Sequence, residues 1–315
     1  MMGKRSHKSL FVASVLLLGA VITQQARADN AVQIDAMGPG NRILGLDISK
    51  YQHTKNLPID FTKMHAAGVR FLYINGGNTV KKADIEAANY YRSDRTGAQL
   101  AGIYTGLYYY AHPPRTTDMN IVIANAHNQA KKVIDRIQED GGYNTLDMPV
   151  ALDIETNCTS MSKSGICHRS MSNVYLVRWV KTWLSDVQSA LGKTPVIYSY
   201  MSFITSHFAY DNDLAKYPIW IATARINPAN PEAKPTMKSG KCPVSPWTDT
   251  KCNVSWKIWQ YSSGGAGARY GLQPGPVDLN VLGGASENFY SLIAPTHKKV
   301  RTNLRRKYGN REFQR

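Results

Sequence analysis

The sequence predicts a single α/β domain folded as an irregular, TIM-like (β/α) barrel. Apolar runs typical of strands alternate with amphipathic helical patterns along the chain. About eight strand candidates fall within roughly 250 residues, which is the size of a closed or nearly closed α/β barrel. The apolar fraction of 43% is that of a folded soluble protein, and neither an internal repeat nor a second core is visible.

The strand candidates are rich in β-branched and aromatic residues and are bounded by turn residues. In chain order they are RILGLDIS (42–49), VRFLYIN (69–75), LAGIYTGLYYYA (100–111), MPVALDIE (148–155), TPVIYSY (194–200) and YPIWIAT (217–223), followed by shorter apolar runs around WKIWQYSS and VDLN. Helical patterns at 58–68, 118–142 and 173–193 lie between them, with apolar residues at three-to-four spacing or a glycine at the end. Alternation of this kind predicts parallel βα units.

The N-terminus is typical of an export signal. Basic MMGKRSHK precedes thirteen apolar or small residues, Leu10 to Ile22, and ARA supplies small residues for cleavage near Ala28. The apolar run is short for a transmembrane helix, which needs about 20 residues, although an uncleaved anchor is the alternative. We therefore expect a secreted or periplasmic protein without a transmembrane anchor, divided into a signal peptide (1–28), a linker (29–41), a catalytic barrel (42–293) and a basic tail (294–315).

The four cysteines fall in two close pairs, Cys158 with Cys167 and Cys242 with Cys252. An even count, close spacing and an export signal favour two local disulfides that staple two insertions. A zinc site is the alternative, but no CxxC spacing supports it.

Positive charge is concentrated at the C-terminal end of the chain. The tail from His297 to Arg315 holds eight Lys or Arg residues and one acid, Glu312. Clustered positive charge attracts polyanions regardless of their sequence, so we expect no specific nucleic-acid partner. The tail could hold nucleic acid without sequence specificity or an anionic envelope polymer, and a solvated end of the chain is the alternative.

Four carboxylates lie in or beside three of the apolar runs: Asp47 in LGLDIS, Asp153 and Glu155 in VALDIE, and Asp278 in GPVDLNVL. Unpaired charge in a buried strand costs several kcal/mol, so these positions need a reason. In a barrel of βα units the carboxyl ends of the strands converge on one face, where active sites form. The sequence therefore predicts that these carboxylates gather at one site.

Residues two apart on a strand project to the same face, which makes Asp153 and Glu155 neighbours about 6 to 7 Å apart. Like charges at that range raise the pKa of one member. A protonated carboxylic acid beside an ionised carboxylate is the pair of groups that glycoside cleavage uses. A structural site is one alternative. Another is Mg²⁺ or Ca²⁺ held by Asp47, Asp153 and Glu155, although the loops hold no dense acidic cluster and the chain has no HxH or HExxH.

Aromatic residues with polar edges are abundant, with 18 Tyr and 6 Trp against 7 Phe. Sugar rings present apolar C–H faces ringed by hydroxyls, and such side chains match both features. The candidates for substrate contact at the ends of strands are Tyr108, Tyr110, Tyr198, Trp220 and Gln260. Filling of the barrel interior is the alternative for each ring.

Seven blocks of the sequence resemble, in their order, the signature of glycoside hydrolase family 25, the N-acetylmuramidases called Chalaropsis-type lysozymes. The blocks run from about Arg42 to Gly284 and are LGLDISKYQ, GLYYYAHP, PVALDIE, PVIYSY, PIWIA, WKIWQYSS and VDLN. Two positions depart from the family pattern. Asn75-Gly76-Gly77 stands where an acid is common, and Tyr108-Tyr109-Tyr110 lacks the usual His.

The resemblance implies cleavage of the β-1,4 bond between N-acetylmuramic acid and N-acetylglucosamine in peptidoglycan, with no metal or organic cofactor. By position, Glu155 would be the general acid-base and Asp153 would orient the substrate's own 2-acetamido group as it attacks the anomeric carbon. Asp47 and Asp278 would tune this pair and hold sugar hydroxyls. Conventional double displacement is the alternative mechanism. The alternative functions are a non-catalytic glycan- or envelope-binding protein on the same barrel and a chitin-type glycosidase.

Overall fold

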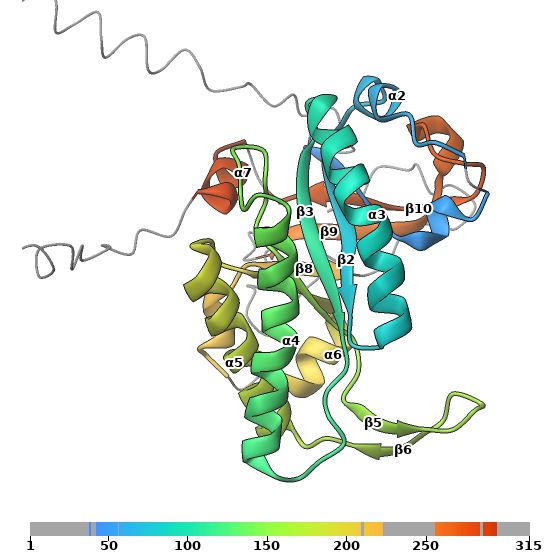
Figure 1. Ribbon diagram of the computed structural model, residues 1–315. Helices are drawn as coiled ribbons and strands as arrows, with labels where there is room; N and C mark the ends of the chain where they lie inside the picture. The colour runs from blue at the N-terminus through green and yellow to red at the C-terminus, as the bar shows by residue number, and fades with distance from the viewer. Residues whose placement is uncertain are drawn as a thin grey trace, which may run out of the picture. The chain divides into compact units, whose positions relative to one another are not determined.

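A computed structural model describes residues 38, 42–55, 57–208, 211–222, 256–283 and 286–294 of the chain. Eight strands close into a barrel in the order β1-β10-β9-β8-β7-β4-β3-β2, and a separate hairpin, β5-β6, projects from it (Figure 1). The predicted export signal, the linker apart from Gly38, the pair Cys242 and Cys252, and the basic tail beyond Ala294 lie outside the described residues. Within those residues no helix combines the length and the apolar character needed to cross a membrane.

The barrel strands are β1 (Leu44–Ile48), β2 (Val69–Asn78), β3 (Tyr104–Ala111), β4 (Ala151–Ile154), β7 (Val196–Tyr200), β8 (Ile219–Ala222), β9 (Trp256–Ala266) and β10 (Pro276–Leu282). The hairpin consists of β5 (Cys158–Met161) and β6 (Cys167–Ser170). The α-helices are α2 (Phe61–Ala66), α3 (Lys81–Leu100), α4 (Met119–Glu139), α5 (Asn173–Leu191), α6 (Met201–His207) and α7 (Ser286–Ile293). The described residues also form three 3-10 helices: η1 (Lys50–His53), η2 (Leu214–Lys216) and η4 (Gly267–Tyr270).

All eight predicted strand regions are confirmed, but the last strand departs from the predicted parallel arrangement. Seven neighbouring strands, from β1 through β2, β3, β4, β7 and β8 to β9, pair in parallel. Strand β10 pairs antiparallel with both β9 and β1. Only η4 and a turn connect β9 to β10, and a parallel crossover needs about a dozen residues or more. The short connection therefore forces the antiparallel closure.

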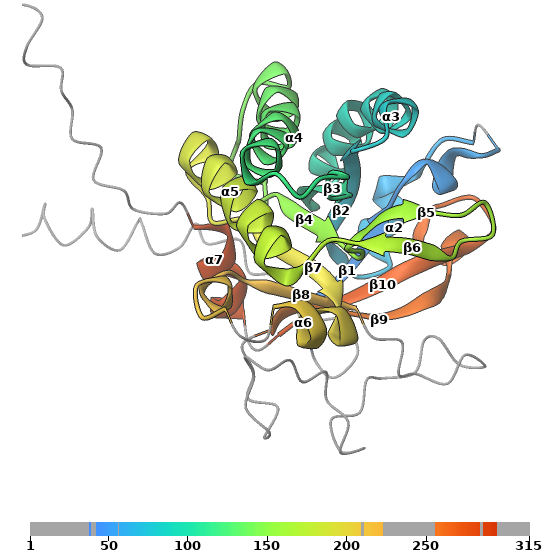
Figure 2. The ribbon, with the colours of Figure 1, turned by 90° about the horizontal axis from the view of Figure 1, so that it is seen from below.

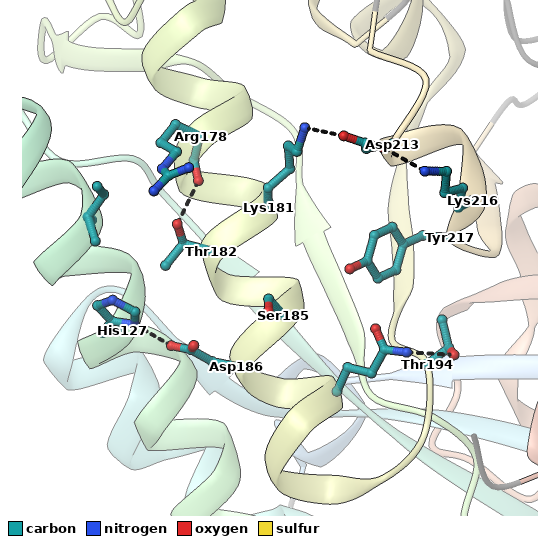
Figure 3. A pocket seen from close by; sticks show the side chains of 12 residues that line it. His127, Arg178, Lys181, Thr182, Ser185, Asp186, Thr194, Asp213, Lys216 and Tyr217 are labelled. Atoms are coloured by element: carbon teal, nitrogen blue, oxygen red, sulfur yellow. Dashed lines mark hydrogen bonds and ion pairs between the residues drawn. The ribbon is translucent and has the colours of Figure 1, made fainter. Parts of the chain in front are cut away.

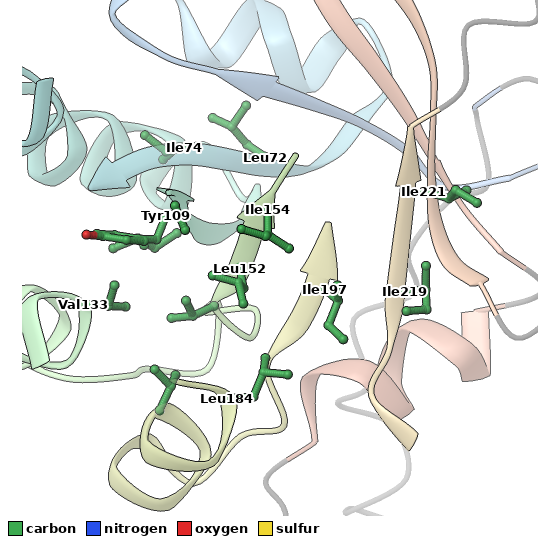
Figure 4. Packing of buried hydrophobic residues seen from close by; sticks show 14 of the residues in the cluster. Leu72, Ile74, Tyr109, Val133, Leu152, Ile154, Leu184, Ile197, Ile219 and Ile221 are labelled. Atoms are coloured by element: carbon green, nitrogen blue, oxygen red, sulfur yellow. The ribbon is translucent and has the colours of Figure 1, made fainter. Parts of the chain in front are cut away.

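The main apolar core lies between the outer side of the barrel and its helices. Helices α3, α4 and α5 lie side by side along β2, β3, β4 and β7 (Figure 2). Leu152 and Ile154 of β4 point outward to this layer, where Val133 of α4 and Leu184 of α5 meet the strands (Figure 4). Each of these side chains is almost fully removed from water, which stabilises the domain by about 1.5 to 3 kcal/mol per side chain.

Two large rings occupy the barrel interior. Tyr73 and Trp220 pack against each other in a tilted arrangement with their centroids 4.5 Å apart, and both are buried. Gly106 makes room for this pair, because a Cβ at that position would lie 2.3 Å from the ring of Tyr73. Tyr73 and Trp220 form the floor of the barrel, and the polar side chains lie above them at the carboxyl-terminal end.

Candidate active site

The structure brings the four predicted carboxylates to the carboxyl-terminal end of the parallel strands. Asp47 lies on β1, Asp153 lies on β4, and Glu155 follows β4 directly. Asp278 lies on β10 opposite Asp47, as its cross-strand partner. Asp47 and Asp153 are buried, whereas Glu155 and Asp278 are half-buried. The predicted gathering of the carboxylates at one site is therefore observed, and Glu155 and Asp278 are its more accessible members.

Two amides fix the side chain of Asp47. Its Oδ2 atom accepts hydrogen bonds from Asn280 Nδ2 at 2.7 Å and from Gln260 Nε2 at 2.9 Å. Burial raises the pKa of Asp47, and these hydrogen bonds oppose that shift. Burial, together with the neighbouring Asp47 carboxylate, also raises the pKa of Asp278, to about 8. The Asp278 carboxyl therefore retains its proton near neutral pH.

Asp153 and Glu155 form the second half of the cluster. Burial, the charge of Glu155 and the charge of Asp47 all raise the pKa of Asp153 well above its ordinary value. Among the described residues, Asp153 Oδ1 is buried and has no hydrogen-bond partner. Buried polar atoms are nearly always paired, so an unpaired carboxyl oxygen at the bottom of a cleft is suited to receive a ligand group.

A cleft of about 420 Å³ opens above Asp153 and Glu155. Two predicted contact residues, Tyr108 and Tyr110, line it together with Tyr51 of η1. A second pocket of about 430 Å³ shares Tyr51 and includes Asp278, and a third of about 360 Å³ includes Gln260 and Tyr200. These hollows line the barrel mouth around the carboxylates, which is the shape that an extended polymer requires.

Tyrosine hydroxyls surround the carboxylate pair. Tyr110 is the cross-strand neighbour of Asp153, and burial together with the charge of Glu155 raises its pKa to about 12. Tyr200 is partly exposed, and its hydroxyl donates a hydrogen bond to the backbone oxygen of Glu155 at 2.9 Å. Both phenols stay protonated at neutral pH; the Tyr200 O–H is engaged by the Glu155 backbone, so the Tyr110 hydroxyl is the one that can donate to a ligand beside the cleft.

The predicted contact of Trp220 with substrate does not agree with its position in the structure. Its side chain is only 1% exposed, because Tyr73, Tyr108 and Tyr198 pack around it. Its Nε1 atom donates a hydrogen bond to Asn280 Oδ1 at 2.8 Å. Trp220 is thus a buried support of the site that cannot contact a substrate in this structure, and the alternative of barrel filling is the right one for this ring.

Gln260 and Tyr198 act on the carboxylates through hydrogen bonds. The Tyr198 hydroxyl donates to Gln260 Oε1 at 2.9 Å, and the amide of Gln260 donates to Asp47. Asn280, which is fully buried and bonds both Trp220 and Asp47, was missed by sequence reasoning. Its signal was present, because Asn280 follows Asp278 by two residues and therefore projects to the same face of β10.

The hairpin β5-β6 begins three residues after Glu155 and is closed by the predicted disulfide between Cys158 and Cys167. At its root, Asn157 and Met171 exchange two hydrogen bonds, and Met171 is buried. The sequence predicted the disulfide but not the strands, since the segment between the two cysteines, TSMSKSGI, is mostly polar. The hairpin is thus fixed to the strand that carries Asp153.

A larger pocket of about 680 Å³ lies away from the carboxylates, over α5 (Figure 3). Most of its charged side chains pair with one another: His127 with Asp186, and Lys181 and Lys216 with Asp213 (Figure 3). Within the described ranges, no group of three or more His, Cys, Asp or Glu side chains is arranged to hold a metal ion.

Comparison with known proteins identifies the family. The profile of glycosyl hydrolases family 25 matches residues 46–268, which contain Asp47, Asp153 and Glu155. The chain belongs to glycosyl hydrolases family 25. It is therefore a glycoside hydrolase, as the ordered blocks of the sequence had indicated.

Individual relatives agree with this assignment. Lysozyme M1 of Streptomyces globisporus is 27% identical over 82% of this chain and 75% of its own length. The N,O-diacetylmuramidase of Chalaropsis sp. is 25% identical over 52% of this chain and 69% of its own. The structure of the bacterial lysozyme from Streptomyces coelicolor matches with a TM-score of 0.58 at 23% identity, covering 81% of this chain and 99% of that one. The last comparison supports the barrel fold.

Proposed function

We propose that this protein is an exported peptidoglycan hydrolase that cleaves the β-1,4 bond between N-acetylmuramic acid and N-acetylglucosamine with retention of configuration. The observation that carries the proposal is the pair at the end of β4: half-buried Glu155 lines the cleft, and beside it Asp153 presents a buried, unpaired oxygen. Family membership supplies the reaction class, and the relatives named lysozyme and muramidase support the substrate.

In this proposal Asp153 and Glu155 share one proton through the hydrogen bond between their side chains, and Glu155 gives that proton to the glycosidic oxygen as the bond from that oxygen to C1 breaks. Asp153 Oδ1 receives the N–H of the substrate's 2-acetamido group, whose carbonyl oxygen attacks C1 and forms a cyclic intermediate. Water then attacks C1 and gives its proton to the Glu155 carboxylate, which restores the starting state. Asp47 is held by the two amides and by Asp278. Asp278 keeps its proton at neutral pH, and both carboxyls contact sugar hydroxyls in the proposed complex.

Double displacement is the alternative mechanism, with Asp153 as the nucleophile that attacks C1. A thiazoline analogue of the cyclic intermediate distinguishes the two mechanisms. Such an analogue resembles a species on the pathway only if the acetamido group takes part in the reaction. We expect it to inhibit the wild-type enzyme and to bind Asp153→Ala much more weakly. Accumulation of a glycosyl ester on Asp153, detected by mass spectrometry, would instead establish double displacement.

The activity itself is tested with the purified mature chain and peptidoglycan, by following new reducing ends and identifying the products by mass spectrometry. We expect Glu155→Gln to lower kcat by about 10²- to 10⁴-fold, which is the contribution typical of a general acid-base. Glu139→Gln, the same change at an exposed position on α4, is the matched control and should retain full activity. Full activity of Glu155→Gln would refute the assignment.

Two other functions fit the same barrel. A non-catalytic glycan-binding protein would bind peptidoglycan without releasing products, and its binding would be unchanged in Glu155→Gln. A chitin-type glycosidase would cleave chitin oligomers faster than peptidoglycan fragments. The retained carboxylate cluster favours catalysis over simple binding, because a buried charged cluster is costly to keep.

For the termini we propose that residues 1–28 are removed on export and that the basic tail binds an anionic envelope polymer. Deleting Lys298 to Arg315 should weaken binding to cell envelopes more at low salt than at high salt, because counterions screen such attraction. Equal loss at both salt concentrations would exclude an electrostatic contribution of the tail.

A further inference from the structure

The hairpin β5-β6 is a feature of this chain that the proposed chemistry does not use. It stands off the carboxyl-terminal end of the barrel, below the strand ends in one view and in front of the barrel mouth in the other (Figures 1 and 2). Thr156 and Asn157 alone separate it from Glu155. The hairpin therefore starts beside the cleft and stands at the same end of the barrel as the carboxylates.

The hairpin is held in one conformation. The disulfide from Cys158 to Cys167 links the first residues of its two strands, and Thr159 Oγ1 donates a hydrogen bond to the Arg169 backbone oxygen at 3.1 Å. At the tip, Ser162 and Ile166 are joined by two hydrogen bonds, and Gly165 adopts the positive φ that the turn requires. A rigid, exposed element loses little conformational entropy when it binds a ligand.

The chemistry of the hairpin is cationic. Residues 157–170 include Lys163, His168 and Arg169 but no Asp or Glu, and all three basic residues are exposed. None of these three side chains has an ion pair or hydrogen bond with another described residue. Two apolar side chains beside them, Met161 and Ile166, are 56% and 63% exposed. The hairpin thus combines unpaired positive charge with apolar surface.

We propose that the hairpin binds the acidic peptide that hangs from the muramic acid lactyl group of peptidoglycan. This inference rests on the proposed function and specifies its substrate as glycan that still carries its peptides. The carboxylates of such a peptide would pair with Lys163 and Arg169, and its small apolar side chains would lie against Met161 and Ile166. The sugar in the cleft places the peptide, because the two are covalently joined.

A naked glycan does not match these features as well. Sugar hydroxyls need hydrogen-bond donors and acceptors arranged around an aromatic face, and the segment 157–170 contains no Tyr, Trp or Phe. The aromatic residues that suit sugar, Tyr51, Tyr108 and Tyr110, all lie in the cleft. The aromatic residues of the cleft therefore suit the sugar, and the basic and apolar residues of the hairpin suit the peptide.

The test compares two substrates: soluble peptidoglycan strands that carry their peptides, and the same strands after an amidase has removed them. The second substrate keeps the lactyl carboxylate, so nonspecific attraction of a cationic protein to an anionic polymer persists in both. The variant is Lys163→Gln/Arg169→Gln. Its matched control is Lys131→Gln/Lys216→Gln, which removes the same charge at exposed positions on α4 and η2.

We expect the hairpin variant to raise KM for the peptide-bearing strands by about three- to tenfold at low salt, as for the loss of two exposed ion pairs, with kcat unchanged. KM for the peptide-free strands should stay within about twofold, as should both KM values of the control variant. Cys158→Ser/Cys167→Ser, which releases the staple, should act in the same direction as the hairpin variant.

An equal rise in KM on both substrates, or no rise on either, would overturn the proposed peptide contact while leaving the hydrolase function intact. If the wild type cleaves neither substrate, the proposed function fails and the peptide contact fails with it.

Discussion

Asp47 and Asp278 face each other across the antiparallel pair of β1 and β10. That contact exists because the last strand runs opposite to its neighbours and closes the barrel against the first. Burial of two carboxyls side by side, with Asn280 and Gln260 donating to Asp47, leaves Asp278 as the member that keeps the proton. The proton is held in a hydrogen bond between the two carboxyls, and its loss would replace that bond by repulsion.

The activity should therefore decline in alkaline solution. We expect kcat/KM to fall as pH rises through about 8, the pKa of Asp278, because repulsion then displaces Asp47 from its place beside Asp153. In Asp278→Asn the amide still donates to Asp47 and cannot ionise, so this alkaline decline should disappear. Rates on soluble peptidoglycan fragments from about pH 5 to about pH 10 measure the profile. An identical decline in the variant would assign it to another group.

Stability should depend on pH through the same residue. The pKa of Asp278 is raised from an ordinary value of 3.8 to about 8 in the folded protein. Below about pH 4 both folded and unfolded chains hold this proton, and between about pH 4 and pH 8 only the folded chain does. The free energy of unfolding therefore falls as pH rises across this window.

Asp278→Asn removes that loss and should be more stable than the wild type at pH 8 by at least about 1 kcal/mol, with a smaller difference at pH 5. Urea denaturation at the two pH values measures the change. A gain that is equal at both would mean that titration of Asp278 is not its cause.

Gln260 allows positioning to be distinguished from substrate contact. It accepts from Tyr198 and donates to Asp47, so Gln260→Ala should lower kcat by about tenfold with little change in KM if its contribution is to hold Asp47. Tyr198→Phe should have a smaller effect in the same direction, and the double variant should be less than additive by about 1 kcal/mol. A rise in KM at constant kcat would show instead that Gln260 binds substrate, as the sequence had suggested.

Most of the barrel and its carboxylates can be predicted from the sequence because each strand, with its carboxylate, is a short contiguous segment. Asp47, Asp153 and Asp278 each lie within an apolar run whose residues also define a strand. Barrel topology then brings the ends of those runs together, whatever lies between them. The family blocks are recognisable for the same reason, since each is a few residues long and local.

The parts that the sequence does not predict depend on contacts between distant residues. Helix α3 is absent from the predicted elements because its buried side carries Asp94 and Arg95, which interrupt the apolar periodicity. Arg95 pairs with Asp147 and Asp94 pairs with His53, both of them far along the chain. The burial of Trp220 likewise depends on Tyr73 and Gly106, which no local pattern connects to it.

The chain of hydrogen bonds from Trp220 through Asn280 to Asp47 yields a prediction with an internal control. Trp220→Phe leaves the buried Asn280 Oδ1 without its donor, which should lower the free energy of unfolding by about 1 to 3 kcal/mol beyond any loss of packing. Trp183 is equally buried, but its indole N–H has no partner among the described residues. Trp183→Phe therefore loses ring volume without breaking a hydrogen bond.

The two substitutions should also differ in catalysis. Freed from Trp220, Asn280 can turn its amide away from Asp47, so Trp220→Phe should lower kcat and shift the alkaline decline of kcat/KM. Trp183→Phe, on the buried side of α5, should leave both unchanged once the protein is fully folded. Denaturation curves and pH-rate profiles of the two variants provide the measurement. Equal effects of both would show that packing alone, rather than the hydrogen bond to Asn280, connects the barrel floor to the carboxylates.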